Sequence, residues 1–330
     1  MESADLKIAI IGAGRWGKNH VKTAASILNP QNITVVDFSP QAEKTVKAVN
    51  NNIKFTTDLN EILSDKNISA AIVATPAETH FDVAKQLINA GKHVLIEKPI
   101  TLVSEDAKVL LELAGENNVK IMVGHVLLYH PAVLKMKELI DRGMMGKIQY
   151  IYSNRLNLGS IRQEENILWS FAPHDISMIQ FLTGKDPVSI DAKGAAYLQS
   201  DIEDTTLTYL EYPGNIKAHI FVSWLNPFKE QKLVVIGEQG MFVFEDSIKE
   251  NKLRFYPKGF RDNQGRLEVF DEGVFLLKFP EKMPLTEEHL HFYDCVVNDK
   301  TPRTDGKHAL KVLEILEEAT EKLKKTAVTG

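Results

Sequence analysis

A glycine-rich turn between an apolar strand and a helix constrains this chain more than any other feature. Residues 6–11 (LKIAII) are predicted to form a short buried strand, and Gly12-Ala13-Gly14-Arg15-Trp16-Gly17 follows directly. A helical stretch comes next, and a second apolar strand ends at Asp37, 20 residues after Gly17. This order of strand, glycine turn, helix, strand and acid is typical of a dinucleotide-binding unit.

Each position of the turn has a physical role. The first glycine permits the tight turn, the second lets the backbone approach a pyrophosphate, and the third lets helix and strand pack closely. The helix N-terminus offers N–H groups and partial positive charge to phosphates. The acid accepts hydrogen bonds from ribose hydroxyls and repels a 2′-phosphate, so NAD is favoured over NADP, with FAD as a competing ligand. The expected cofactor residues here are Gly12, Gly14, Arg15, Trp16, Gly17 and Asp37.

Bulk properties exclude several classes of function. A chain of 330 residues suggests two domains. The net charge of -5 without a basic stripe argues against nucleic acid as a partner. The apolar runs are shorter than a bilayer span, and the first residues lack a signal-peptide pattern, so a cytoplasmic protein without membrane partners is expected. Cys295 is the only cysteine, which leaves no intramolecular disulfide or thiolate cluster.

The first 125 residues alternate short apolar strands with helical stretches. We predict strands at 7–11, 33–36, 70–74, 93–96 and 120–123, with helices near 15–28, 40–50, 79–90 and 104–117. Such alternation indicates a doubly wound parallel sheet, an α/β Rossmann domain over residues 1–125. Ligands of such sheets lie beyond the carboxyl ends of the strands.

The pattern changes in residues 126–330, which we assign to a second, α+β domain. Residues 131–141 are a predicted helix and 147–157 a strand with alternating apolar and polar side chains. Further strands are expected at 188–198, 204–212, 216–225, 231–237, 241–245 and 252–256, with helices near 286–298 and 305–324 that pack back on the body. Strands joined by short turns such as Tyr212-Pro213-Gly214-Asn215 indicate a large, open, mainly antiparallel sheet. We expect this domain to bind substrate and to support oligomerisation.

Polar residues follow the third and fourth predicted strands of the first domain. Thr75-Pro76 lies where a strand-end loop meets cofactor, or is an ordinary turn, and His80 is a packing, capping or ligand-contacting residue. Glu97 and Lys98 follow the fourth strand. A lysine there can donate to a hydroxyl oxygen and stabilise an alkoxide, and Glu97 can orient it or contact the cofactor. A solvated surface pair is the alternative.

His174 and Asp175 mark the start of an apolar helix in our prediction, with Pro173 at its first position. Free N–H groups at a helix start would lower the pKa of His174 and keep its imidazole neutral, as a general base requires. Asp175 would act in the opposite direction. Both residues could instead simply cap the helix.

Other polar residues could contact a substrate. Arginines 155 and 162 could bind a diphosphate or carboxylate in a bidentate way, or pair with Glu164 and Glu165. The candidate substrate contacts are Tyr129, His130, Arg155, Asn157, Arg162 and His174. We expect no metal site, because the common metal-binding motifs are absent and His289 and His291, two residues apart on a helix, face different ways.

Taken in order, these motifs resemble the Gfo/Idh/MocA oxidoreductases. The segments that carry the resemblance are IAIIGAGRWGKNH, VVDFSP, ATPAETHFDVA, GKHVLIEKPI, GHVLLYHPA, LIDRGMMGKI and EEHLHFYDCVVNDKTPRTDG. The resemblance implies a Rossmann domain, a C-terminal domain with a large open sheet, and NAD(P)-dependent oxidation or reduction at a CH–OH group of a sugar or polyol. It also implies catalytic roles for the lysine of the E-K-P motif and for a histidine, which correspond to Lys98 and His174.

The chain departs from the family pattern at the acids that accompany this histidine. Ser170 and Ser177 stand at the two usual acid positions, and Asp175 directly follows His174. Asp175 is therefore a candidate substitute, and Lys98 could equally carry more of the proton transfer.

Within the family, the segments 150–179 and 226–237 resemble bacterial nucleotide-sugar 3-dehydrogenases of surface-polysaccharide synthesis. They imply NAD-dependent oxidation of the 3-hydroxyl of UDP-N-acetylglucosamine or its uronate. An open, apolar sheet face in the second domain would favour a dimer or tetramer. A free polyol such as an inositol is the second hypothesis for the substrate, and a catalytically inactive NAD- or sugar-sensing protein is the third.

Overall fold

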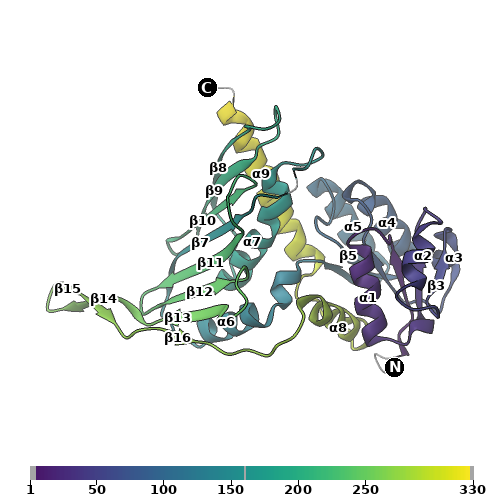
Figure 1. Cartoon of the computed structure of the whole chain (residues 1–330), viewed down its shortest axis with the longest axis horizontal. Helices are drawn as coiled ribbons and strands as arrows, with labels where there is room; N and C mark the ends of the chain where they lie inside the picture. Colours follow the sequence, from purple (N-terminus) through teal and green to yellow (C-terminus); the bar gives the residue numbers. More distant parts are fainter. Residues whose placement is uncertain (1–4, 160, 328–330) are drawn as a thin grey trace. The chain divides into compact units, whose positions relative to one another are not determined.

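The computed structural model describes residues 5–159 and 161–327, whose chain divides into two compact units (Figure 1). The first unit comprises Met1–Tyr129 and Lys282–Leu313, and the second His130–Glu281 and Glu314–Gly330. The first therefore includes a C-terminal segment that is distant in sequence. None of the described helices is long and apolar enough to cross a membrane.

The first unit contains a six-stranded parallel sheet in the order β3-β2-β1-β4-β5-β6. Its strands are β1 (Ile8–Ile11), β2 (Ile33–Val36), β3 (Lys54–Thr56), β4 (Ala70–Val73), β5 (His93–Ile96) and β6 (Ile121–Val123). The residues of β1 and β4 are all buried, as expected of strands covered on both faces. The order reverses direction at β1, which places the ligand crevice of such a sheet beside the glycine turn.

Helices connect these strands and pack in two groups. They are α1 (Gly17–Ile27), α2 (Ala42–Lys47), α3 (Asn60–Ser64), α4 (His80–Asn89), α5 (Ser104–Glu116) and the C-terminal α8 (Pro284–Val297), with short 3-10 turns η2 (Pro30–Asn32), η3 (Ala77–Thr79) and η4 (Val126–Tyr129). α4 packs against α5, whereas α1 packs against α2 and α8. The predicted Rossmann sheet is confirmed, although β3 and α3 were not predicted.

The second unit contains an eight-stranded sheet in the order β16-β13-β12-β11-β7-β10-β9-β8 (Figure 1). Its strands are β7 (Ile148–Leu156), β8 (Ser189–Ala195), β9 (Thr205–Tyr212), β10 (Ile216–Ser223), β11 (Glu230–Gly237), β12 (Met241–Glu245), β13 (Leu253–Tyr256) and β16 (Phe275–Leu276). Only β7 and β10 pair in parallel. The mainly antiparallel sheet is thus confirmed, and the predicted turn at 212–215 joins β9 to β10 as a hairpin.

One face of this sheet is covered by helix α7 (Ile167–Thr183), which packs against β7, β9 and β10. Alternate residues of β7 face it and are buried, including Ile151, Ser153 and Arg155. The unit also contains α6 (Pro131–Asp141), and α9 (Gly306–Ala327) crosses the boundary between the two units.

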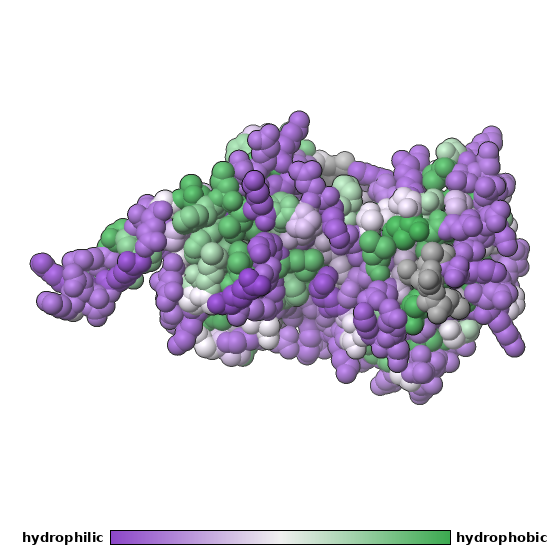
Figure 2. All heavy atoms as spheres, turned by 90° about the horizontal axis from the view of Figure 1, so that it is seen from below, coloured by the Kyte–Doolittle hydropathy of each residue, from purple (hydrophilic) through white to green (hydrophobic). Residues whose placement is uncertain are grey.

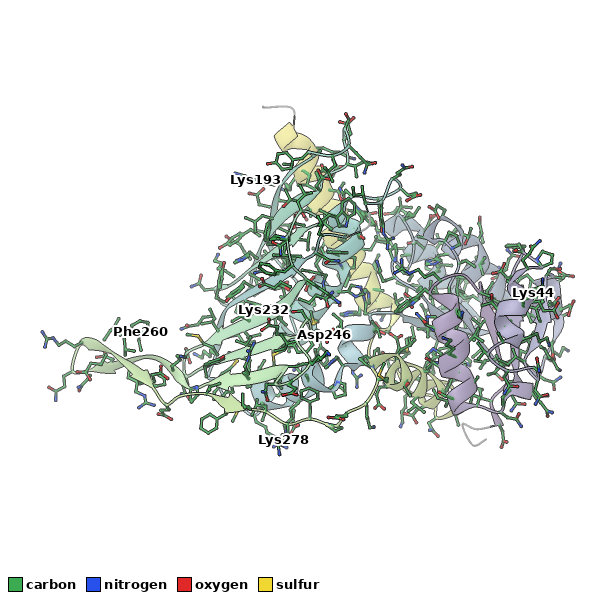
Figure 3. The ribbon with its side chains drawn as sticks, in the orientation of Figure 1. Lys44, Lys193, Lys232, Asp246, Phe260 and Lys278 are labelled. Carbon is green, nitrogen blue, oxygen red and sulfur yellow. The ribbon has the colours of Figure 1, made fainter. Side chains whose placement is uncertain are left out.

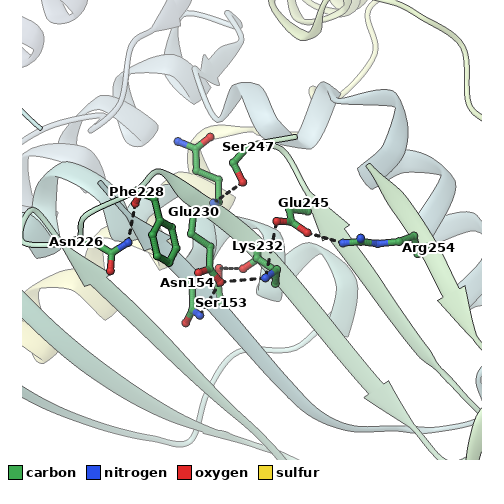
Figure 4. Close-up of polar contacts among 10 residues, drawn as sticks. Ser153, Asn154, Asn226, Phe228, Glu230, Lys232, Glu245, Ser247 and Arg254 are labelled. Atoms are coloured by element: carbon green, nitrogen blue, oxygen red, sulfur yellow. Dashed lines mark hydrogen bonds and ion pairs between the residues drawn. The ribbon is translucent and has the colours of Figure 1, made fainter. Parts of the chain in front are cut away.

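The opposite face carries large side chains that remain partly exposed. Leu207 and Tyr209 of β9 are 46% and 37% exposed, and hydrophobic surface is visible over this unit in Figure 2. Charged residues also cross the same face: Lys232 lies 3.2 Å from Glu230 and 3.8 Å from Glu245, and Glu245 also pairs with Arg254 (Figure 4). The face therefore combines apolar area with internally paired charges.

A two-stranded hairpin, β14 (Lys258–Asn263) with β15 (Arg266–Asp271), extends from the edge of the sheet (Figure 1). Phe260 of this hairpin (labelled in Figure 3) lies opposite Val269, and both side chains are largely exposed. Gln264 and Gly265 at its tip both have positive φ, as a tight hairpin turn requires. This hairpin was not predicted.

Candidate active site

The glycine turn has the geometry that its three glycines predict. Gly12 has a φ of +94°, and a Cβ there would lie 2.7 Å from the carbonyl oxygen of Ala74. A Cβ on Gly17 would lie 2.1 Å from the carbonyl oxygen of Gly12. A Cβ on Gly14, in contrast, would meet no protein atom within 4 Å. Packing within the chain therefore requires glycine at positions 12 and 17, whereas Gly14 borders open space.

Asp37 is hydrogen-bonded to the backbone of this turn. One carboxylate oxygen accepts a hydrogen bond from the backbone N–H of Ala13 at 2.7 Å, and the other accepts from Ser39 at 2.9 Å. The acid at the end of β2 therefore lies against the glycine turn, where a dinucleotide ribose would lie. The open space at Gly14 and this carboxylate together fit NAD, whose pyrophosphate would lie at the turn and whose adenosine ribose would lie at Asp37.

Glu97 connects the glycine turn to the end of β5. Its Oε1 accepts hydrogen bonds from the indole N–H of Trp16 and, at 2.8 Å, from His20 Nε2. Its Oε2 accepts from the backbone N–H of Lys98 at 3.2 Å. Burial raises the pKa of Glu97, but the hydrogen bonds and charges of His20, Trp16 and Lys98 outweigh that effect, so the net pKa lies below its usual value. Glu97 is thus a carboxylate in a buried setting.

Gly124 makes room for this carboxylate. It follows β6, and a Cβ there would lie 3.0 Å from Glu97 Oε1 and 3.1 Å from Oε2. The next residue, His125, is buried, and burial together with the charges of His308 and Lys98 lowers the pKa of His125 well below its usual value. A neutral imidazole therefore lies close enough to Lys98 to respond to its charge. Neither residue was singled out from the sequence.

The other predicted cofactor residues lie at neighbouring strand ends. Thr75 and Pro76 follow β4, and Thr75 Oγ1 accepts a hydrogen bond from Thr79 at 2.7 Å. His80 is buried at the start of α4, with its Nδ1 2.7 Å from the Pro99 carbonyl and its Nε2 3.0 Å from the Thr75 carbonyl. Its ring therefore joins the loops that follow β4 and β5. These contacts give His80 a structural role beside the predicted site.

The structure corrects the predicted start of the helix that carries His174. Helix α7 begins at Ile167, because Asn166 accepts a hydrogen bond from the N–H of Trp169 and so caps the helix seven residues before Pro173. Pro173 and the half-buried His174 lie inside the helix. The predicted effect of free helix N–H groups on the pKa of His174 is therefore wrong, since such groups occur only in the first turn.

Asp175 has partners of its own. Its Oδ1 accepts from Ser153 at 2.6 Å and from Arg155 Nη2 at 3.1 Å, and its Oδ2 accepts from Arg155 Nε at 2.7 Å. Both members of this bidentate ion pair are buried. Its hydrogen bonds hold α7 to β7, which leaves neither charge unengaged for an exposed diphosphate.

The remaining substrate candidates do not share one location in their units. The hydroxyl of Tyr129 is buried against Thr304 at 2.9 Å, and burial raises its pKa. His130 caps α6 by accepting from Ala132 N–H. Arg162 is an exposed partner of Glu165, as the alternative interpretation predicted. The backbone N–H of Asn157 donates to the Ser223 carbonyl at 3.1 Å.

The described residues contain no group of three or more histidines, cysteines or acids placed to hold a metal ion. His289 and His291 do face apart: His289 contacts His20, whereas His291 accepts from the backbone N–H of Arg303 at 2.9 Å.

Comparison with known proteins agrees with the geometry. Residues 6–125 match the model of an oxidoreductase family with an NAD-binding Rossmann fold, and residues 133–243 match the GFO/IDH/MocA C-terminal domain.

Among curated proteins, the chain is 28% identical over 204 residues to an inositol 2-dehydrogenase of Rhizobium meliloti, covering 60% of this chain and 61% of that protein. It is 27% identical to a scyllo-inositol 2-dehydrogenase (NAD(+)) of Bacillus subtilis, covering 90% and 88%. It is 26% identical to a UDP-N-acetylglucosamine 3-dehydrogenase of Acidithiobacillus ferrooxidans, covering 93% and 94%. The solved structure of that last enzyme matches with a TM-score of 0.84 at 22% identity over 97% of this chain and 98% of the other, a likeness of fold.

Gly14→Ala and Gly17→Ala form a matched pair that separates cofactor space from packing. Gly14→Ala should leave the melting temperature near that of the wild type but weaken NAD binding at least tenfold, because the methyl group enters the space beside the turn. Gly17→Ala should lower stability by about 1–3 kcal/mol through overpacking. Thermal melts and calorimetric NAD titrations measure both. Unchanged NAD affinity in Gly14→Ala would contradict the assignment.

Asp175→Ala should destabilise the protein by about 3–5 kcal/mol, because it leaves Arg155 buried and uncompensated. The double variant Asp175→Leu/Arg155→Met removes both charges and should recover much of that loss. Urea unfolding of the two variants measures the difference. An equal loss of unfolding free energy in the single and the double variant would show that the unpaired Arg155 charge does not cause the destabilisation.

Glu288 is another buried acid, on α8, and its two carboxyl oxygens have no hydrogen-bond partner among the described residues. Burial and the charge of Glu97 raise the pKa of Glu288 well above its usual value. The unfolded chain therefore releases this proton at lower pH than the folded one, so the wild type loses stability as the pH rises above about 4.5.

Glu288→Gln removes this titration. Its stability relative to the wild type should increase from pH 5 to pH 8, by up to about 1.4 kcal/mol per pH unit. The exposed neighbour Glu287, changed to Gln, is the control and should show no such slope. Urea unfolding at each pH is the measurement, and wild-type and Glu288→Gln stabilities that run parallel across this range would argue against a neutral Glu288.

Proposed function

Because the chain belongs to the Gfo/Idh/MocA oxidoreductase family and is an NAD-dependent dehydrogenase, we propose that it oxidises the 3-hydroxyl of a UDP-linked N-acetyl sugar. The substrate is UDP-N-acetylglucosamine or its uronate, and the product is the 3-keto sugar. The match to a UDP-N-acetylglucosamine 3-dehydrogenase over 93% of this chain supports this substrate class.

The observation that carries the proposal is the position of Glu97 and Lys98. They stand at the carboxyl end of β5, in the sheet that bears the glycine turn, and Trp16 of that turn donates to Glu97. Carboxyl ends of parallel strands are where such sheets bind their ligands. A lysine at this edge is in the place where a substrate hydroxyl can meet a dinucleotide.

The chemistry follows from the charges. When bound, NAD would supply the nicotinamide ring to which the hydride of the substrate carbon is transferred. The Lys98 ammonium donates a hydrogen bond to the substrate oxygen and stabilises the negative charge that develops as the hydroxyl proton leaves. Glu97 holds the backbone of Lys98 at this strand end through its N–H. On the family resemblance alone, we propose His174 as the second catalytic group, to which the hydroxyl proton passes directly or by way of Lys98.

A free polyol is the second candidate substrate. Two inositol dehydrogenases match at 28% and 27% identity, slightly above the 26% of the nucleotide-sugar enzyme. The ion pair that engages Arg155 and Asp175 also removes one of the two arginines expected to bind a diphosphate. A direct comparison of turnover with a UDP-linked sugar and with a free polyol therefore distinguishes the two candidate substrates.

We further propose that the protein is a homo-oligomer, a dimer or tetramer, formed through the open face of the eight-stranded sheet. Leu207 and Tyr209 are among the exposed apolar residues of this face. A large exposed apolar area on a single chain is typical of a surface that binds another protein chain.

The test is the formation of NADH. Purified protein is incubated with NAD and, in parallel, with UDP-N-acetylglucosamine, its uronate or myo-inositol, and absorbance of NADH is followed, with and without an added oxo acid to recycle bound NADH. Turnover is expected with a UDP sugar, and Lys98→Met should lower kcat at least a thousandfold while leaving NAD binding within about threefold, because oxyanion stabilisation contributes about 10²–10³ and proton transfer more. Turnover of the inositol alone would favour the second candidate, and NAD binding without any turnover would favour a sensor.

A further inference from the structure

Four buried side chains of the first unit form one hydrogen-bonded chain. Glu97 Oε1 lies 2.8 Å from His20 Nε2, and His20 Nδ1 lies 2.8 Å from His289 Nε2. His289 Nδ1 in turn lies 3.0 Å from the hydroxyl of Tyr293. The residues come from the end of β5, from α1 and from α8, and both imidazole rings are fully buried. The C-terminal helix therefore reaches the E-K-P glutamate through two imidazoles.

With the Glu97 carboxylate ionised and His289 neutral, the protons along this chain have only two arrangements. A carboxylate only accepts, so His20 Nε2 must carry a proton. If His20 is neutral, its Nδ1 accepts from His289 Nε2–H, and His289 Nδ1 accepts from the hydroxyl of Tyr293. If His20 carries a second proton, both links reverse: His20 Nδ1–H donates to His289, and His289 Nδ1–H donates to Tyr293. The tautomer of His289 therefore reports the charge of His20.

The groups around the chain keep its other members in fixed states. Burial and the charge of His20 lower the pKa of His289 well below its usual value, so His289 stays neutral in both arrangements. Burial raises the pKa of Tyr293, so its hydroxyl stays protonated. The nearby charged or titratable groups are Glu288 on α8, whose pKa is raised well above its usual value by burial and by the charge of Glu97, and Lys98 beyond β5, whose charge favours the Glu97 carboxylate. Trp16, on the glycine turn, donates to the same Glu97 oxygen.

We propose that His20, His289 and Tyr293 are positioning residues for Glu97. Their chain directs one oxygen of Glu97 to the glycine turn and leaves the other to the backbone N–H of Lys98, and a single proton on His20 sets the direction of its remaining links. The expected effect on catalysis rests on the function proposed for Lys98. The expected tautomers of His20 and His289 do not depend on that function.

The first experiment needs no substrate. Nitrogen NMR of the ligand-free wild-type protein, labelled at histidine, follows the ring nitrogens of His20 and His289 with pH. We expect the proton of His289 to be on Nε2 wherever His20 is neutral and on Nδ1 wherever His20 is doubly protonated. If His20 keeps one protonation state over the whole range in which the protein is folded, His289 must keep the matching tautomer. A His289 with the other tautomer, or one that is itself doubly protonated, would overturn the chain.

Substitution of His289 separates positioning from packing. Gln can replace Nε2 and keep the link to His20, whereas Asn places its amide near Nδ1 and breaks that link. His289→Asn should move the Nδ1 signal of His20 toward that of a ring nitrogen without a hydrogen-bond partner, because the link between the two rings is lost. His289→Gln should leave this signal close to that of the wild type. His291→Asn, on the same helix, is the matched control and should also leave the Nδ1 signal of His20 unchanged.

The kinetic result has to agree. His289→Asn is expected to lower kcat about tenfold with KM for the substrate within twofold, and His289→Gln should restore most of that loss. If both variants lose stability equally and neither changes the Nδ1 signal of His20, the role is structural and the proposal fails. Coupled tautomers in a protein that turns over no substrate would leave the chain intact and refute the proposed function instead.

Discussion

The buried carboxylate of Glu97 is the contact on which the site depends. An isolated carboxylate is costly to bury, and it stays ionised only because Trp16, His20 and Lys98 supply hydrogen bonds and positive charge. These three groups come from different parts of the first unit, namely the glycine turn, helix α1 and the end of β5. Satisfying one carboxylate therefore fixes the relative placement of the cofactor turn and the lysine.

The Rossmann half of the fold was predictable because its strands are buried on both faces. The apolar runs at β1 and β4 and the glycine turn between β1 and α1 have no good alternative fold. β3 was missed because three residues, Lys54 to Thr56, are too few to show a period. The hairpin β14–β15 was missed because its two faces are both largely solvent-exposed, so no alternation of burial marks it, although Gln264-Gly265 is a turn signal.

The candidate site was predictable only in part. Motifs place Gly12, Gly14 and Lys98 because local sequence determines a turn or a strand end. The partners of Glu97 lie 77 and 81 residues away in sequence, and the contact of His20 with His289 spans 269, so no spacing rule reveals them. The start of α7 was misplaced because Pro173 suits a first helical position, whereas Asn166 provides the actual cap and the helix tolerates the proline inside.

In the proposed reaction, hydrogen leaves the substrate carbon that bears the 3-hydroxyl and arrives on the nicotinamide. UDP-N-acetylglucosamine deuterated at C3, incubated with NAD and the protein, tests this directly by NMR of the reduced cofactor. We predict deuterium on the nicotinamide ring and a 3-keto sugar. Reduced cofactor without deuterium, with the deuterium retained on the sugar, would contradict this reaction.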